Sequence, residues 1–185
     1  FPSDTVPAYR NRVNPAADIE EFLAELLFAD LDQASNRLAR LEASLKKPTG
    51  DRHEQEQELG LLKRVLEALE SEQPVSSAIH TDAEGKLLRS FAFLSQKPIL
   101  AVLNCSEADV SAQSEPVGRL DCVRLSAKIE EEMAQLPSED RKEFLADLGL
   151  ESSARDRLVK ACYDRMDLIS FLTQGPKEVR AWTIP

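Results

Sequence analysis

Apolar residues recur at steps of three and four along a stretch that starts near residue 15, which is typical of one face of a helix. The series comprises Ile19, Phe22, Leu23, Leu26, Leu27, Leu31, Ala34, Leu38, Leu41 and Leu45. Asn14 can cap free amides, and Pro15 at the first helical position has no amide to satisfy. The pattern predicts a helix over 15–47, roughly 50 Å long at 1.5 Å per residue.

A second helical stripe follows the turn cluster Pro48-Thr49-Gly50-Asp51 and extends to about residue 71. Its apolar positions are Leu59, Leu62, Val65, Leu66 and Leu69. Two helices joined by a short turn form an antiparallel hairpin. We expect the leucine stripe to join the two arms, with a dimer interface as the alternative.

The middle of the chain changes to an α/β pattern. Thr81 and Glu84 have the spacing of a capping box, and Leu87, Leu88, Phe91 and Leu94 should share one face of the helix that follows. The apolar run 99–103 predicts a central parallel strand, and residues 122–125 predict a second strand followed by a helix over 127–136.

The last third of the chain predicts two packing helices and a hairpin. Ser138 should cap a helix that ends at Gly149, and Ser153 should start another whose packing face carries Leu158, Val159, Cys162 and Met166. The alternation over 168–173 and 179–184, around a Gln-Gly-Pro turn, predicts a β-hairpin. We expect Trp182 to pack in this sheet and a strand from flanking sequence to cover its edge.

The balance of charge limits which partners the chain can bind. Lys and Arg number 23 against 33 Asp and Glu, for a formal charge of −10, so contact with RNA would need a local basic patch. No apolar run approaches the roughly 20 residues of a membrane span, and we expect a cytoplasmic protein with no membrane partner. Cys105, Cys122 and Cys162 match neither a metal site nor a disulfide framework.

Two polar loops follow the two predicted parallel strands. Asn104-Cys105-Ser106-Glu107 comes after the first strand and Ser126-Ala127-Lys128 after the second. Ligands of open α/β sheets bind beyond the carboxyl ends of the strands, so the two loops can hold a purine base between them. An Asn amide can donate to and accept from a purine edge, whereas a carboxylate accepts only. An ordinary turn or helix cap is the alternative interpretation of the first loop.

At these loops the sequence resembles the YchF-type Obg-like ATPases. Asn104-Cys105-Ser106-Glu107 resembles the N-x-x-E motif that replaces the N-K-x-D guanine motif of GTPases, and the second loop resembles the family's other base contact. Four further stretches resemble signatures of the family: NPAADIE at 14–20, ADL at 29–31, KEFLADLG at 142–149 and KEVRAWTI at 177–184. The resemblance implies a preference for ATP over GTP, with base contacts from Asn104, Cys105, Glu107, Ser126 and Ala127.

The resemblance also implies a domain organisation. The fold expected is a helix-rich α/β chain: part of a P-loop NTPase (G-domain-like) parallel sheet, an inserted antiparallel coiled-coil hairpin, and the first hairpin of a TGS-type β-grasp domain. The boundaries expected are 1–14 for a remnant of the upstream nucleotide-binding domain, 15–73 for the helical hairpin, 74–167 for the C-terminal half of the NTPase domain, and 168–185 for the start of the TGS domain. The chain has no Met at its start, so we expect missing flanking segments of its own domain to be partners.

No G-x-x-x-x-G-K-[ST] motif is present in the 185 residues. No residue here is therefore predicted to cradle phosphates or hold Mg²⁺, and Mg²⁺ is expected only together with a phosphate-binding segment. We assign no catalytic and no metal-ligating residue, and leave open whether the chain is an enzyme. The connection from Asn104 to Ser126 is also several residues shorter than the family's.

Two functions from different classes fit these observations. The first is a segment of an ATP-binding, translation-associated ATPase that reads adenine but does no phosphate chemistry. The second is a non-enzymatic, degenerate ATPase-like module within a ribosome or another large assembly. In either case the hairpin tip, with Lys46, Lys47 and Arg52, is a candidate contact for ribosome or RNA, although charges on long helices are more often a solvated face.

Overall fold

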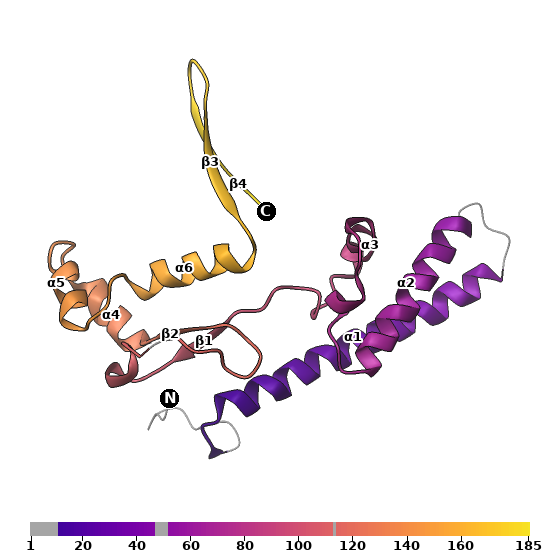
Figure 1. Cartoon of the computed structure of the whole chain (residues 1–185), viewed down its shortest axis with the longest axis horizontal. Coiled ribbons are helices and arrows are strands. Elements are labelled where there is room, and N and C mark those ends of the chain that lie inside the picture. The colour runs from indigo at the N-terminus through magenta and orange to yellow at the C-terminus, as the bar shows by residue number, and fades with distance from the viewer. Residues whose placement is uncertain (1–10, 47–51, 113) are drawn as a thin grey trace. The chain divides into compact units, whose positions relative to one another are not determined.

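The computed structural model describes residues 11–46, 52–112 and 114–185 (Figure 1). Its contacts divide the chain into two compact units: a helical unit, Ala17–Lys97, and a sheet unit, Pro98–Pro185 together with Phe1–Ala16. The helix-rich α/β class is confirmed. The coiled-coil and TGS assignments and the domain boundaries stay predictions, and the predicted turn at 48–51 lies outside the described residues.

The helical unit is built on the two helices that the apolar stripes predict. Helix α1 spans Pro15–Leu45 and helix α2 spans Arg52–Glu70, and Figure 1 shows them along each other. Their facing apolar residues are buried in one core, to which α1 contributes Ala34 and Leu41 and α2 contributes Leu61, Leu62, Val65 and Leu69. The predicted seam between the arms is therefore a real core within one chain.

Helix α3 (Asp82–Leu88) starts with the predicted capping box. The amide of Glu84 donates to Thr81 Oγ1 over 3.3 Å, and the amide of Thr81 donates to the Glu84 carboxylate over 3.2 Å. The predicted common face of Leu87, Leu88, Phe91 and Leu94 is wrong: Leu88 is buried, but Leu87 and Leu94 are exposed. The helix tightens into the 3₁₀ turn η3 (Arg89–Phe91), and Ala92 then adopts a left-handed φ of 53°, which breaks the helical period.

A buried carboxylate joins α1 to the segment that follows η3. Asp30 is fully buried and accepts hydrogen bonds from the amides of Leu94 (2.8 Å) and Ser95 (2.7 Å) and from the Ser95 hydroxyl (2.6 Å). The amide of Val75, in the 3₁₀ turn η2 (Val75–Ala78), donates in turn to Ser95 Oγ over 3.0 Å. Residues on both sides of α3 are thus fixed to α1 through the side chains of Asp30 and Ser95.

The sheet unit contains the predicted pair of parallel strands. Strand β1 (Ala101–Asn104) pairs with β2 (Cys122–Leu125) in a register that runs from Ala101 opposite Cys122 to Asn104 opposite Leu125. The prediction of a strand buried on both sides is wrong for β1, because its burial alternates and Val102 is 49% exposed. This alternation shows that the unit covers one face of the sheet.

Three helices follow β2: α4 (Ala127–Gln135), α5 (Asp140–Asp147) and α6 (Ala154–Arg165). Ser153 caps α6 as predicted, accepting from the Asp156 amide at 3.1 Å, and Gly149 ends the α5 turn with φ 68°. The predicted cap at Ser138 is wrong, because Glu139 precedes α5 and makes no side-chain cap bond.

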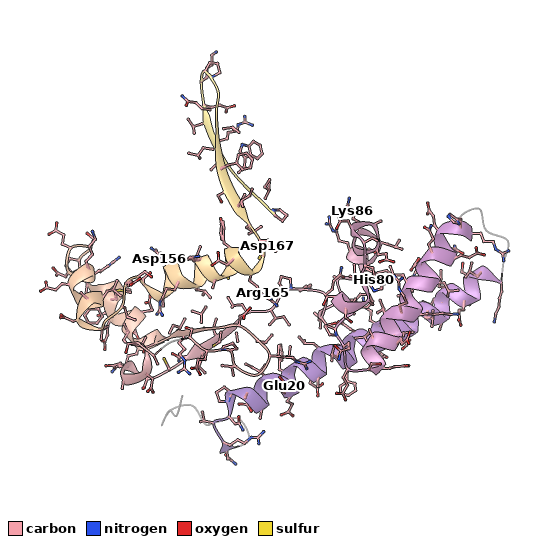
Figure 2. The ribbon with its side chains drawn as sticks, in the orientation of Figure 1. Glu20, His80, Lys86, Asp156, Arg165 and Asp167 are labelled. Atoms are coloured by element: carbon pink, nitrogen blue, oxygen red, sulfur yellow. The ribbon has the colours of Figure 1, made fainter. Side chains whose placement is uncertain are left out.

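The predicted packing face of α6 is also wrong, since Val159, Cys162 and Met166 are exposed. The two ends of the helix make defined contacts. Ala154 is buried at the start, and at the other end Arg165, labelled in Figure 2, donates from Nε to the Ile99 carbonyl over 3.2 Å.

The chain ends in the predicted hairpin, with β3 (Ile169–Gln174) antiparallel to β4 (Val179–Ile184). Every residue of both strands is exposed. Trp182 lies opposite Phe171 and donates from Nε1 to Thr173 Oγ1 over 2.8 Å, but it is 44% exposed and not part of a core. None of the described helices is long and apolar enough to cross a membrane.

Candidate purine-base site

The two loops that follow β1 and β2 border one hollow of about 320 Å³. Parallel strands end at the same edge of a sheet, so the register of β1 with β2 brings Asn104 next to the start of α4. The lining residues are Asn104, Cys105, Ser106, Glu107, Ala108, Ser126 and Lys128. The structure therefore brings together four of the five predicted base-contact residues in the lining, and the fifth, Ala127, lies between two of its members.

Asn104 joins the two loops. Its side-chain Oδ1 accepts a hydrogen bond from the amide of Ala127 over 3.0 Å. One lone pair of the amide oxygen is thus occupied, and the second lone pair and the Nδ2 group remain for a ligand. The prediction that Asn104 both donates to and accepts from a purine stays a prediction, and the Ala127 amide is engaged in this bond.

Cys105 and Ser126 hold the two loops in place through hydrogen bonds and packing. The Cys105 amide donates to the Leu125 carbonyl over 2.8 Å and its thiol approaches the same oxygen at 3.2 Å, while the side chain packs in a small core with Val110 and Ile129. Ser126 is buried and caps α4 by accepting from the Ile129 amide at 3.5 Å. Both residues are better placed to hold the loops than to contact a base directly.

Glu107 faces a cation across the hollow. Lys128 Nζ lies 2.5 Å from Glu107 Oε1 and 3.8 Å from Glu132 Oε1, one turn further along α4. The hydrogen bond to Glu107, followed by the charges of both carboxylates, raises the pKa of Lys128 above its ordinary value. Lys128 lies in the second predicted loop without a predicted role, and its spacing of four residues from Glu132 is the sequence signal for this pairing.

The side chains that line the hollow offer hydrogen-bonding groups. Among the described residues, no group of three or more His, Cys, Asp or Glu side chains could hold a metal ion. Asn104 Nδ2 as a donor and the Glu107 carboxylate as an acceptor fit the edge of a purine, and the hollow lies within the ≈300–1,000 Å³ of ordinary ligand pockets.

The basic residues of the helical hairpin are mostly paired with acids. Arg37 makes a two-pronged bond to Glu58 (2.6 and 2.8 Å), which raises the Arg37 pKa, and Arg52 lies 2.9 Å from Glu56. Lys63 lies 3.9 Å from Glu42, and Arg64 pairs with Glu84. These pairs reduce the positive charge that the hairpin could offer to RNA. Lys47 lies outside the described residues.

Comparison with known proteins extends over the whole chain. No family model matches it. The "Ribosome-binding ATPase YchF" of Bacillus subtilis is 34% identical over 194 residues, covering 99% of this chain and 52% of that protein. The proteins of the same name from Escherichia coli O157:H7 and Mycoplasma genitalium are 32% and 34% identical over 197 residues each, and cover 100% and 99% of the chain.

The chain belongs to the YchF family. It spans about half the length of the curated relatives it matches. A solved structure described as the Schizosaccharomyces pombe YchF GTPase covers 98% of the chain with a TM-score of 0.79 at 23% identity, and 52% of that structure is matched. This likeness shows that the chain has the fold of that structure. The curated relatives confirm the resemblance to the YchF-type Obg-like ATPases.

Proposed function

We propose that this chain supplies the adenine-recognition part of the nucleotide site of a ribosome-associated ATPase. The observation that carries the proposal is the convergence of Asn104 and Glu107 with the start of α4 around one hollow. The name that the bacterial relatives share, ribosome-binding ATPase, supports the activity and the partner.

The choice of adenine follows from the groups available. Both purines present an acceptor at N7, which Asn104 Nδ2 can meet in either base. At the neighbouring position adenine carries an amino donor, whereas guanine carries a carbonyl acceptor. A carboxylate such as Glu107 bonds to the first and repels the second. In this proposal Asn104 recognises a purine and Glu107 selects ATP over GTP.

The base contacts alone give weak binding. Two or three hydrogen bonds of about 1 kcal/mol each fall short of the roughly 4 kcal/mol that corresponds to millimolar affinity. Phosphate and Mg²⁺ contacts from residues other than those of this hollow must supply the remainder. We therefore propose no catalytic residue in this chain, and treat its role as selection of the base.

The test is an NMR titration of the full chain with ATP and with GTP, with and without Mg²⁺, because chemical shifts detect binding that is weaker than millimolar. We expect ATP to perturb the amides of residues 104–108 and 126–128 more than GTP does. Asn104→Asp keeps an oxygen for the Ala127 amide and removes the Nδ2 donor, so it should lose binding without loss of fold. Asn36→Ala, in the helical unit, is the control. Equal perturbation by ATP and GTP, or none at nucleotide concentrations of tens of millimolar, would contradict the proposal.

Ribosome association is a separate part of the proposal. Its support is the name that the relatives share, and four described basic residues of the helical unit, Arg37, Arg52, Lys63 and Arg64, are already paired with acids. Reversal of the charges at the tip, Lys46→Glu with Arg52→Glu, followed by co-sedimentation with ribosomes, tests the hairpin as the contact. Retained co-sedimentation would assign ribosome binding to another surface.

A further inference from the structure

Lys128 is the cationic residue in the lining of the hollow, and base recognition as proposed gives it no role. Its ammonium links the loop after β1 to the first turn of α4, at 2.5 Å from Glu107, and Glu132 holds it from the other side at 3.8 Å. Only Oε1 of Glu107 takes part in this contact, so Oε2 has no partner among the described residues. The pair therefore fixes the carboxylate and still leaves it an oxygen for a ligand.

The exposure of the pair decides how strongly it can act. The Lys128 side chain is 68% exposed and that of Glu107 is 49% exposed. Ion pairs in such positions are weak and are screened by salt. The contact can orient a side chain and tune a preference, but it cannot close the hollow against a ligand.

We propose that Lys128 is a positioning residue for base choice: it holds Glu107 beside the hollow with one carboxylate oxygen directed to the base. The inference rests on the adenine recognition proposed above. The pairing acts in two ways. It presents an acceptor to the amino group of adenine, and it withholds from the carbonyl of guanine an ammonium that would otherwise stabilise that base.

The first measurement is the ratio of ATP to GTP affinity in the full chain and in its variants. Lys128→Met should lower this ratio roughly two- to fivefold, as expected for the loss of an exposed ion pair, and Lys128→Arg should restore it. Added salt should lower the wild-type ratio and leave that of Lys128→Met unchanged. Lys160→Met is the matched control, because Lys160 also forms an exposed pair, with Asp164 on α6 at 2.7 Å, outside the hollow.

The second measurement needs no nucleotide. NMR titration of the Lys128 ammonium should give a lower pKa in Glu107→Gln than in the wild type, because the hydrogen bond to Glu107 is the main cause of the raised value. An unchanged pKa would show that the pair does not form in solution and would overturn the inference alone.

The remaining outcomes separate the inference from the proposed function. If the wild type prefers ATP and Lys128→Met keeps the same ratio, or binds ATP more tightly, Lys128 does not position Glu107 and only the inference fails. If the wild type shows no preference for ATP although the Lys128 pKa responds to Glu107→Gln, the proposed function fails, and the role of Lys128 in base choice fails with it.

Discussion

Asp30 offers the most direct test of what holds the helical unit together. It is a fully buried carboxylate whose hydrogen-bond donors are the amides of Leu94 and Ser95 and the Ser95 hydroxyl. Asp30→Ala removes the acceptor for all three donors at once. The segment that follows η3 then loses its attachment to α1, because these donors lie more than 60 residues away in the sequence.

The size of the effect can be worked out from the burial of the donors. The Ser95 amide and hydroxyl bonds are buried, and a buried donor left without a partner costs about 1–3 kcal/mol. The Leu94 amide bond is only part-buried, so water can replace part of it. We expect Asp30→Ala to lower the free energy of unfolding by about 3 kcal/mol, and Asp30→Asn, which keeps one acceptor oxygen, by about half as much.

The assay is urea unfolding followed by far-UV circular dichroism, which reports mainly on the long helices α1 and α2. The single tryptophan, Trp182, lies in the final hairpin of the sheet unit, and its fluorescence gives a separate reading of that hairpin in the same titration. Asp32→Ala is the matched control, since Asp32 is an exposed neighbour on α1 and should change stability by no more than about 0.5 kcal/mol. A loss for Asp30→Ala no larger than that of Asp32→Ala would refute the reasoning.

An ion pair and a backbone conformation give two further predictions. The hydrogen bond from Arg64, followed by that from the His80 amide, lowers the pKa of Glu84 from 4.5 to about 2. The stability that ionised Glu84 contributes is therefore complete above pH 4.5 and is lost as the pH falls towards 2. Glu84→Gln keeps the capping box without the charge; acid unfolding curves should be flatter than wild type in this window, and parallel curves would contradict the assignment. Gly149→Ala places a side chain at φ 68° in open space, and should cost about 1 kcal/mol by thermal unfolding, whereas no change would show that the turn relaxes freely.

Local signals in the sequence were enough to predict most elements. The stripes of α1 and α2, the capping box at Thr81 and the alternation of the final hairpin each depend on residues within a few positions of one another. The errors arise where local rules do not decide. Ser138 has the chemistry of a cap but Glu139 already has helical dihedrals, and Ala92 takes a left-handed conformation that nothing in its residue type announces.

The attachment through Asp30 was not predictable, because its partners are 64 and 65 residues away and a lone Asp inside an amphipathic helix is usually exposed. At the candidate site, the order of strands and loops placed Asn104 and Ser126 at one edge. The sequence could not show that the Asn104 oxygen is used by the Ala127 amide, since that depends on side-chain rotamers and on the register of β1 with β2.

The hydrogen bonds and the ion pair around the hollow explain why the choice of base and the strength of nucleotide binding should depend on different residues. Asn104 is tied to Ala127, Ser126 caps α4, and Glu107 is held by Lys128, so the loops are organised before any ligand arrives. A preorganised site loses little conformational entropy on binding, and it also has few groups left to offer. A base then gains one donor and one acceptor, enough to distinguish adenine from guanine but too little to hold a nucleotide. Substitutions at Glu107 or Lys128 should therefore change the ratio of ATP to GTP affinity more than they change the affinity for purine nucleotides as a class.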